Sequence, residues 1–243
     1  MEAAAVGTDL TRRVSVVTGA GSGVGRAIAE ALATAGSSVC LVGRTGVTLD
    51  ETAARLGELG RSYPTDITDD SAVRGLVERL IGEHPSIDVL VHSAGVHAMG
   101  AVEDAPIGDL DAQYRTNVRA PYVLTQALLP ALRRSRGQVV FVNSSAGLAA
   151  RGRVGPYAST KHALRALAYS LRDEVNDAGV RVLSIYLGRT ASPMQAAIHA
   201  AEGMDYRPGD LLQPADVAAM VVAALRLPPT AEVTEISIRP MRK

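Results

Sequence analysis

The sequence predicts an α/β fold, with a doubly wound parallel sheet in a three-layer sandwich that forms a single domain. Short apolar, β-branched runs alternate with Ala- and Leu-rich stretches of helical period. The apolar runs lack the polar alternation of a half-exposed sheet, so helices should cover both faces of the sheet. No linker, repeat or low-complexity segment divides residues 1–243, a length that supports one large hydrophobic core.

The elements follow from these patterns in chain order. The strands are expected where an apolar run is short and flanked by turn residues, namely at 14–17, 39–42, 61–65, 87–91, 138–142, 180–187 and 232–238. The third of these runs, 61–65, carries the weakest strand signal. The helices are expected where apolar residues recur three and four positions apart: 25–35, 49–59, 71–82, 109–132, 157–176 and 214–225. Residues 188–213 have mixed polarity with several Gly and Pro, so we expect a long functional loop there, a lid over the substrate.

Composition excludes several classes of function. The formal net charge is zero and no polybasic run occurs, so nucleic acid is not an expected partner. Cys40 is the only cysteine, which leaves no intrachain disulfide and no thiolate cluster, and no spacing indicates a metal site. No apolar run approaches about 20 residues, and Met1 to Leu10 do not resemble a secretory signal. We therefore expect a cytoplasmic protein without a membrane span.

A glycine-rich turn follows the first expected strand and opens the first helix. Its sequence, Thr18 to Gly25, matches T-G-x-x-x-G-x-G through Gly19, Gly23 and Gly25. Glycines let the backbone approach a pyrophosphate closely, and a helix amino end offers free N–H groups to the anion. An ordinary Gly-rich turn is the alternative, but the strand–motif–helix order favours a dinucleotide site in a Rossmann-type fold.

The end of the second strand bears on the choice of nucleotide. It reads Leu41-Val42-Gly43-Arg44, without the acid that would bond the ribose 2′-hydroxyl of NAD. A guanidinium can make two bonds to a 2′-phosphate, so Arg44 favours NADP(H), although it could equally be a solvated arginine. Asp66, after the third strand, could bond the adenine amino group. Alternatively, Asp66 or Thr68 caps the next helix.

A second group of polar residues carries the chemistry. Ser144 and Ser145 end the fifth strand, and Tyr157 and Lys161 lie four apart on one face of the helix that follows. An ammonium near a phenol lowers the pKa of the phenol, which would let Tyr157 exchange protons near neutral pH. On its own, a tyrosine and a lysine four residues apart more often lie on a helix surface without a catalytic role. Here Lys161 is the only lysine besides Lys243 among 25 basic residues.

In the order and spacing of these motifs the chain resembles the short-chain dehydrogenase/reductase family, in its single-domain branch. The resemblance covers Arg13 to Arg239 and rests on Thr18 to Gly25, Ala94-Gly95, Asn117, Ser144, Tyr157 and Lys161. It implies an enzyme that transfers a hydride between a nicotinamide and a ketone or secondary alcohol.

The resemblance also implies roles for individual residues. Tyr157 would be the catalytic acid and base, Lys161 would bond the nicotinamide ribose, Ser144 rather than Ser145 would orient the substrate, and Asn117 would hold a water. The cofactor would further contact Gly19, Ser22, Gly23, Val24, Gly25, Arg44, Asp66, Ile67, Ser93, Ala94, Gly95, Gly188 and Thr190. Two departures occur: His92-Ser93 stand where the family has two asparagines, and Leu187 stands where it has proline.

Aliphatic side chains dominate the expected substrate pocket, which favours a medium-sized, mainly apolar ketone or alcohol. They are Met99, Leu148, Val154, Met194, Ile198, Met204, Tyr206 and Leu211. Arg151, Arg153, His97 and His199 could add polar contacts. The resemblance and two long Ala/Leu-rich helices predict a homo-oligomer, a tetramer or dimer. The rival interpretations are a non-catalytic NADP-binding regulator on the same fold, an NAD-dependent alcohol dehydrogenase, and an epimerase or dehydratase.

Overall fold

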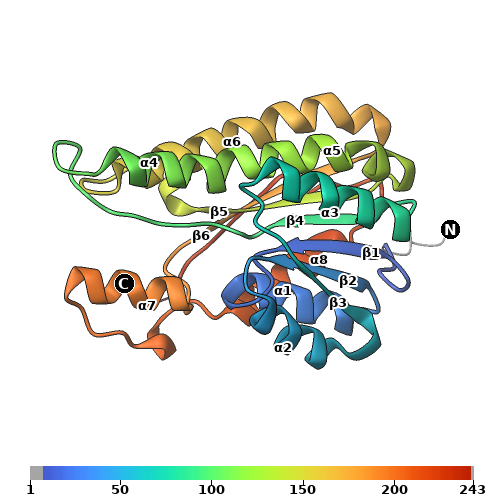
Figure 1. The fold of residues 1–243 in the computed structure, drawn as a ribbon, viewed down its shortest axis with the longest axis horizontal. Helices are drawn as coiled ribbons and strands as arrows, with labels where there is room; N and C mark the ends of the chain where they lie inside the picture. The colour runs from blue at the N-terminus through green and yellow to red at the C-terminus, as the bar shows by residue number, and fades with distance from the viewer. Residues whose placement is uncertain (1–7, 242–243) are drawn as a thin grey trace, which may run out of the picture.

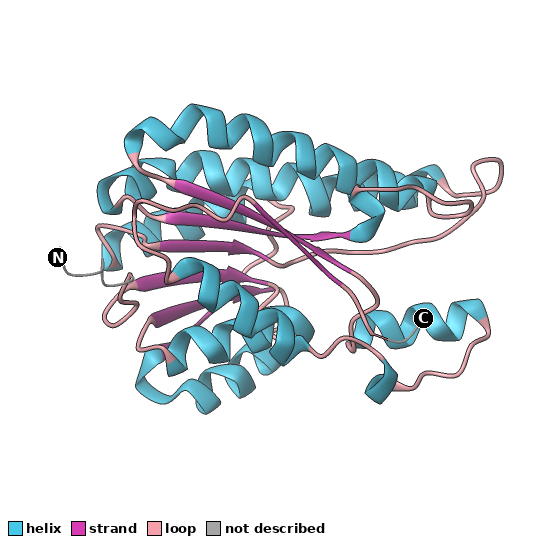
Figure 2. Cartoon of the chain, turned by 180° about the vertical axis from the view of Figure 1, so that it is seen from behind, coloured by secondary structure: helices cyan, strands magenta, loops and turns pink. Residues whose placement is uncertain are grey.

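A computed structural model describes residues 8–241, so most of the stretch from Met1 to Leu10, and Lys243, lie outside the described residues. The predicted fold is confirmed: seven strands form one parallel sheet in the order β3-β2-β1-β4-β5-β6-β7, with helices on both faces (Figures 1 and 2). No helix within residues 8–241 is long and apolar enough to cross a membrane.

The strands lie where the sequence predicts them, within three residues at each end. They are β1 Val14–Thr18, β2 Ser38–Gly43, β3 Gly60–Pro64, β4 Val89–His92, β5 Gln138–Ser144, β6 Arg181–Leu187 and β7 Glu235–Ile238. The helices are α1 Gly23–Thr34, α2 Gly46–Leu56, α3 Asp70–Glu83, α4 Ile107–Tyr114, α5 Ala120–Ser135, α6 Gly155–Val175, α7 Pro193–Glu202 and α8 Pro214–Leu225.

Two apolar cores lie on opposite faces of the sheet because successive strand residues point to opposite sides. Val16 and Leu90 belong to the core under α3, α5 and α6, whereas Val17 and Val91 belong to the core under α1, α2 and α8. Figure 1 shows these two helical layers above and below the strands. Covering both faces explains why the centres of β1, β2, β4, β5 and β6 are mainly apolar on both sides.

One sequence prediction is confirmed with an added detail, and another needs correction. The region expected to be helical over 109–132 is helical throughout, with a π-helical turn at Arg115–Arg119 between α4 and α5. The segment 188–213 was expected to be an irregular loop, yet it contains α7. Ser192 caps this helix by accepting a hydrogen bond from the Gln195 backbone, and Gly203 ends it in the left-handed conformation.

The strand order reverses between β1 and β4, and the carboxyl ends of the strands share one edge of the sheet. In Figure 1, α7 lies beyond this edge and faces the α4 end of the molecule. The architecture therefore leaves a recess between the sheet edge and the lid segment.

Candidate active site

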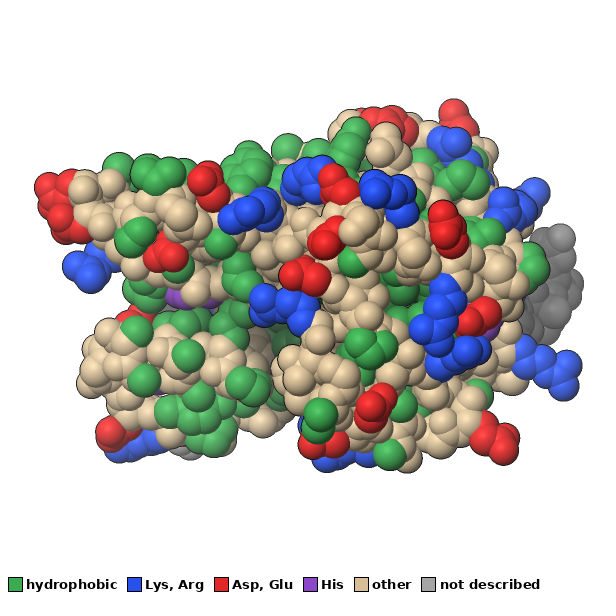
Figure 3. Space-filling view, viewed as in Figure 1, with side chains coloured by type: hydrophobic (Ala, Val, Ile, Leu, Met, Phe, Trp, Pro, Cys, Tyr) green, Lys and Arg blue, Asp and Glu red, His purple; other side chains and the backbone are tan. Residues whose placement is uncertain are grey.

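A single cleft of about 1640 Å³ runs along the carboxyl ends of the strands. Figure 3 shows its mouth between the α4 end and the α7 segment, with a histidine visible inside. Of the predicted site residues, every one except Asn117 lines it: Gly19, Ser22, Gly23, Val24, Gly25, Arg44, Asp66, Ile67, Ser93, Ala94, Gly95, Ser144, Tyr157, Lys161, Gly188 and Thr190. The structure thus brings residues from distant parts of the sequence into one recess.

The glycine loop is shaped for close backbone contact. Gly19 has a φ of 68°, and a Cβ there would lie 2.8 Å from the Ala94 backbone. A Cβ on Gly25 would lie 2.3 Å from the Gly19 carbonyl oxygen. The first turn of α1 carries no acidic residue, and Ser22, its N-cap, makes no side-chain capping bond. The turn therefore leaves helix N–H groups directed at the cleft without a competing carboxylate, which fits a pyrophosphate.

Arg44 stands at the rim of the cleft where β2 ends. It is exposed and, among the described residues, forms no salt bridge, although its charge helps hold the pKa of Asp66 low. The larger causes of that lowered pKa are hydrogen bonds donated to the Asp66 carboxylate by the Thr68 amide and hydroxyl, at 2.9 and 2.8 Å. Neither Asp66 nor Thr68 caps α3; Asp69 does. Arg44 is thus available to an anionic ligand.

Ser144 and Lys161 are fixed relative to each other through Asn143. The Asn143 amide donates to the Lys161 carbonyl oxygen at 3.1 Å and accepts from the Ser144 amide at 2.7 Å. Gly147 allows this contact, since a Cβ there would lie 2.7 Å from the Asn143 Oδ1. The Ser144 hydroxyl oxygen accepts from the Ala146 amide at 3.2 Å, and the Ser144 side chain also hydrogen-bonds Tyr157. The end of β5 and the start of α6 therefore form one rigid unit.

The environment of Tyr157 corrects one expectation. Burial raises the pKa of Tyr157 to about 12, and a hydrogen bond with the Ser144 side chain opposes this rise only in part. Burial also lowers the pKa of Lys161 to about 8. The Lys161 ammonium lies 5.7 Å from the centre of the Tyr157 ring and donates to the Val142 carbonyl oxygen at 3.2 Å. The predicted lowering of the Tyr157 pKa by Lys161 is not found, because burial raises this pKa and the one opposing cause is the Ser144 side chain.

Asn117 lies behind the cleft, in the π-helical turn, and is 1% exposed. Its side chain accepts from the Val96 amide and donates to the Val96 carbonyl oxygen, both at 2.9 Å. It also donates to the Thr160 hydroxyl at 3.1 Å. Asn117 therefore ties the loop after β4 to the beginning of α6, next to Tyr157 and Lys161. Helical irregularities of this kind often accompany functional sites.

Known proteins resemble this chain over nearly its full length. The sequence model of the short chain dehydrogenase family matches residues 13–203. The chain belongs to this family. An uncharacterized oxidoreductase of Staphylococcus epidermidis is 33% identical over 230 residues, which cover 94% of this chain and 97% of that protein.

Solved structures of the family agree with the fold. An alcohol dehydrogenase of Thermococcus sibiricus, complexed with 5-hydroxy-NADP, superposes with a TM-score of 0.87 at 25% identity and covers 96% of this chain and 98% of that one. A short chain dehydrogenase of Shigella flexneri, complexed with NADP, gives 0.86 at 28% identity over 94% of this chain and 98% of that one. The protein of the present sequence is accordingly an oxidoreductase of the short chain dehydrogenase family with a nicotinamide-binding Rossmann fold.

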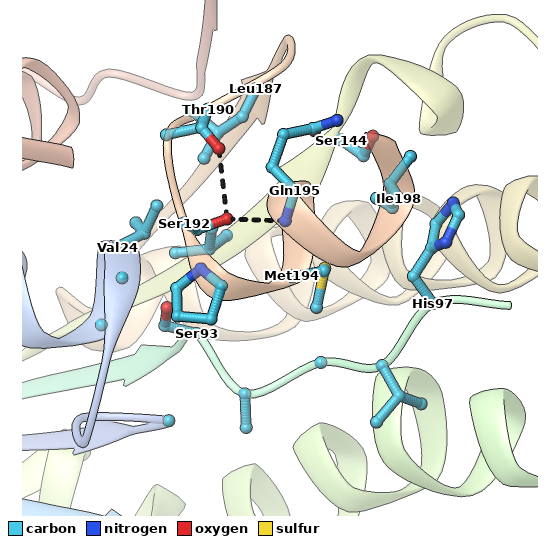
Figure 4. Close-up of a pocket in the computed structure, with 18 of the residues that line it drawn as sticks. Val24, Ser93, His97, Ser144, Leu187, Thr190, Ser192, Met194, Gln195 and Ile198 are labelled. Carbon is cyan, nitrogen blue, oxygen red and sulfur yellow. Dashed lines mark hydrogen bonds between the residues drawn. The ribbon is translucent and has the colours of Figure 1, made fainter. Parts of the chain in front are cut away.

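The amino end of α7 is fixed by local hydrogen bonds and by a contact with the glycine loop. The Ser192 hydroxyl donates to the Thr190 carbonyl oxygen and accepts from the Gln195 amide, each at 3.1 Å (Figure 4). The Tyr206 hydroxyl accepts from the Ser192 amide at 3.1 Å. A Cβ on Gly23 would lie 3.3 Å from the Ser192 Cβ, so the amino end of α7 contacts the glycine loop.

The predicted aliphatic residues line the cleft, with one exception. Tyr206 is absent from the lining and instead packs edge-on against His199, with ring centroids 5.4 Å apart. Of the two arginines near Ser144, Arg151 lines the cleft and Arg153 does not.

Sequence reasoning missed a polar cluster in the segment 188–213. Arg189 donates to the Glu202 carboxylate at 2.7 Å, and its guanidinium lies 3.4 Å from the His199 Nε2. Gln195, buried beside His199, completes the cluster and also lines the cleft. The spacing of Gln195, His199 and Glu202, three and four residues apart, could have indicated one helix face. Within residues 8–241, no group of three or more His, Cys, Asp or Glu side chains could hold a metal ion.

Proposed function

We propose that this protein is an NADPH-dependent carbonyl reductase that transfers a hydride between NADP(H) and a ketone or secondary alcohol of medium size. The observation that carries the proposal is the meeting of Ser144, Tyr157 and Lys161 with the glycine loop in one cleft. A bound nicotinamide would supply or accept the hydride, and the protein's own residues would handle the proton.

Tyr157 is the proton donor in reduction. Its pKa of about 12 keeps the phenol protonated at neutral pH, so the proton is present when a carbonyl oxygen gains charge. The Ser144 hydroxyl, which hydrogen-bonds Tyr157, would turn its proton to the same oxygen and orient it. Both donors are held by rigid elements, so little reorganisation is needed when charge develops.

Lys161 serves both the cofactor and the tyrosine. Its ammonium is buried at the floor of the cleft and bonds the Val142 carbonyl oxygen, which leaves two further N–H groups for a ribose hydroxyl. Its positive charge stabilises the phenolate that remains once the proton has left. Asn117 positions the start of α6 through Thr160, and its proposed water would connect Lys161 with solvent.

The preference for NADP over NAD rests on Arg44. Its guanidinium is exposed at the cleft rim without a salt bridge among the described residues, and β2 ends without an acid. Two of the solved relatives were complexed with NADP or its 5-hydroxy derivative, which agrees with this choice. Ser22, Gly23 and Val24 would contact the phosphates, Asp66 and Ile67 the adenine, Ser93 to Gly95 the ribose, and Gly188 and Thr190 the carboxamide.

The test is a fluorescence titration of the purified protein with NADPH and with NADH, followed by turnover assays on a panel of ketones. Tight NADPH binding, weak NADH binding and turnover would support the proposal. Tighter NADH binding would indicate an NAD-dependent alcohol dehydrogenase instead. NADPH binding without any turnover would favour the non-catalytic regulator.

Three further predictions remain open. A homotetramer or dimer, a cytoplasmic location and a lid spanning residues 188–213 of one domain all follow from the sequence and the resemblance. Light scattering at micromolar concentration tests the first, and a monomeric mass would contradict it.

A further inference from the structure

His97 occupies a place in the cleft that the proposed chemistry does not use. It lies in the loop after β4, and its imidazole packs edge-on against the Tyr157 ring, with centroids 4.5 Å apart and the planes 62° apart. Figure 4 shows the ring rising from this loop toward α7, on the side of Ile198. A substrate whose carbonyl oxygen meets the Tyr157 hydroxyl must therefore extend past the imidazole.

The imidazole nitrogens of His97 are free to bond a ligand. Among the described residues, none donates a hydrogen bond to this ring or accepts one from it. By contrast, His92 bonds Thr125, His162 bonds the Ala158 carbonyl oxygen, and His199 bonds Gln195. A half-buried ring beside the catalytic tyrosine, with unused polar atoms, is a binding group rather than a packing group.

The charges around His97 define what it can bind. Burial is the largest cause that lowers the pKa of His97, the Lys161 ammonium adds to it, and the Glu202 carboxylate opposes it. The imidazole is therefore neutral at pH 7. The Arg189 guanidinium is already bonded to the Glu202 carboxylate at 2.7 Å, so the cation of this pair is not free to hold a substrate carboxylate.

We propose that the substrate carries an uncharged polar group, a hydroxyl or second carbonyl, next to the carbon that is reduced, and that the His97 imidazole hydrogen-bonds this group. The inference rests on the proposed function and narrows its substrate class from apolar ketones to oxygenated ones. The reduction itself is unchanged: the hydride reaches the carbonyl carbon, the Tyr157 proton reaches its oxygen, and NADPH becomes NADP.

The test compares two ketones of nearly equal shape, diethyl ketone and the hydroxyketone in which a hydroxyl replaces one of its terminal methyl groups. The wild-type protein should show the higher kcat/KM with the hydroxyketone. His97→Phe keeps an aromatic ring but removes the hydrogen bond, so it should lower kcat/KM for the hydroxyketone about tenfold and leave diethyl ketone nearly unchanged. His97→Gln, which retains a hydrogen-bonding side chain, should recover part of the preference.

The matched control is His84→Phe, the same substitution at the end of α3 outside the cleft, which should alter neither ketone. An equal loss on both ketones in His97→Phe would mean that His97 only packs against Tyr157. A wild-type preference for diethyl ketone, or for the 2-oxo acid of the same length, would also overturn the inference and needs no variant. Absence of turnover with every ketone, despite NADPH binding, would instead overturn the proposed function.

Discussion

Acid sensitivity of the fold should originate in His92, at the end of β4. Its ring is 2% exposed, stacks on Phe141 with centroids 5.0 Å apart, and bonds the Thr125 hydroxyl at 2.8 Å. Burial lowers the pKa of His92 from 6.5 to about 3. The folded protein therefore keeps this ring neutral at pH values where the unfolded chain takes up a proton.

The sign and size of the effect follow from this difference. The contribution of the neutral His92 ring to the free energy of unfolding is complete above pH 6.5 and is lost as the pH falls toward 3. In that window His92 binds a proton only in the unfolded chain. At pH 5 the unfolded chain gains about 2 kcal/mol from protonating this one residue. Urea unfolding at constant protein concentration should show the wild-type protein losing that amount between pH 7 and pH 5, beyond the loss in His92→Asn.

The variant is chosen because it removes the titratable ring and keeps a neutral polar side chain at this position. Asparagine is neutral at all these pH values, and it is the residue that the family resemblance leads one to expect at this position. His84→Asn, at a partly exposed site, is the control and should keep the full wild-type pH dependence. If His92→Asn and the wild-type protein lost stability equally between pH 7 and pH 5, the reasoning from burial would be refuted.

Three predictions concern the cleft. Tyr157→Phe should abolish turnover with NADPH binding nearly unchanged in a fluorescence titration; retained turnover would remove Tyr157 from its role. Arg44→Ala should weaken NADPH binding about 10- to 100-fold through lost charge-assisted bonds, with little effect on NADH; an equal loss for both would mean that Arg44 does not contact the 2′-phosphate. Lys161 loses its charge above about pH 8, so kcat/KM for reduction should fall above that pH. Lys161→Arg should move this fall to higher pH. An identical pH profile in the variant and the wild-type protein would assign the fall to another group.

Much of the fold is readable in the sequence because each element carries a local signal. The strands β1, β2 and β5 are apolar runs whose residues enter both cores, and α8 lies at the predicted residues, Pro214–Leu225. Capping chemistry for α7 is also present, with Ser192 before Pro193 and Gly203 at the end. The Gly and Pro content of the surrounding segment obscured this helix, since composition alone predicts a loop.

The division between α4 and α5 carries no comparable signal. The apolar period continues through Arg115–Arg119, and the π-helical turn there forms where Asn117 bonds the Val96 backbone. That contact joins two segments that are 21 residues apart in sequence. Only the folded arrangement can show it, so the sequence could assign Asn117 by family resemblance but not by its geometry.

The electrostatics of the site depend on burial, which the sequence does not encode locally. A spacing of four residues places Tyr157 and Lys161 on one helix face, and from that spacing alone the ammonium should favour the phenolate. The fold buries Lys161 and partly buries Tyr157, so the pKa of each is shifted toward its neutral form, the phenol upward and the amine downward. In the proposed mechanism Tyr157 is therefore the acid for reduction, and the oxidative direction would require the phenolate that Lys161 stabilises. Oxidation of an alcohol should accordingly accelerate as the pH rises toward about 8, whereas reduction should fall only above that pH, and parallel profiles in the two directions would contradict this assignment of the proton.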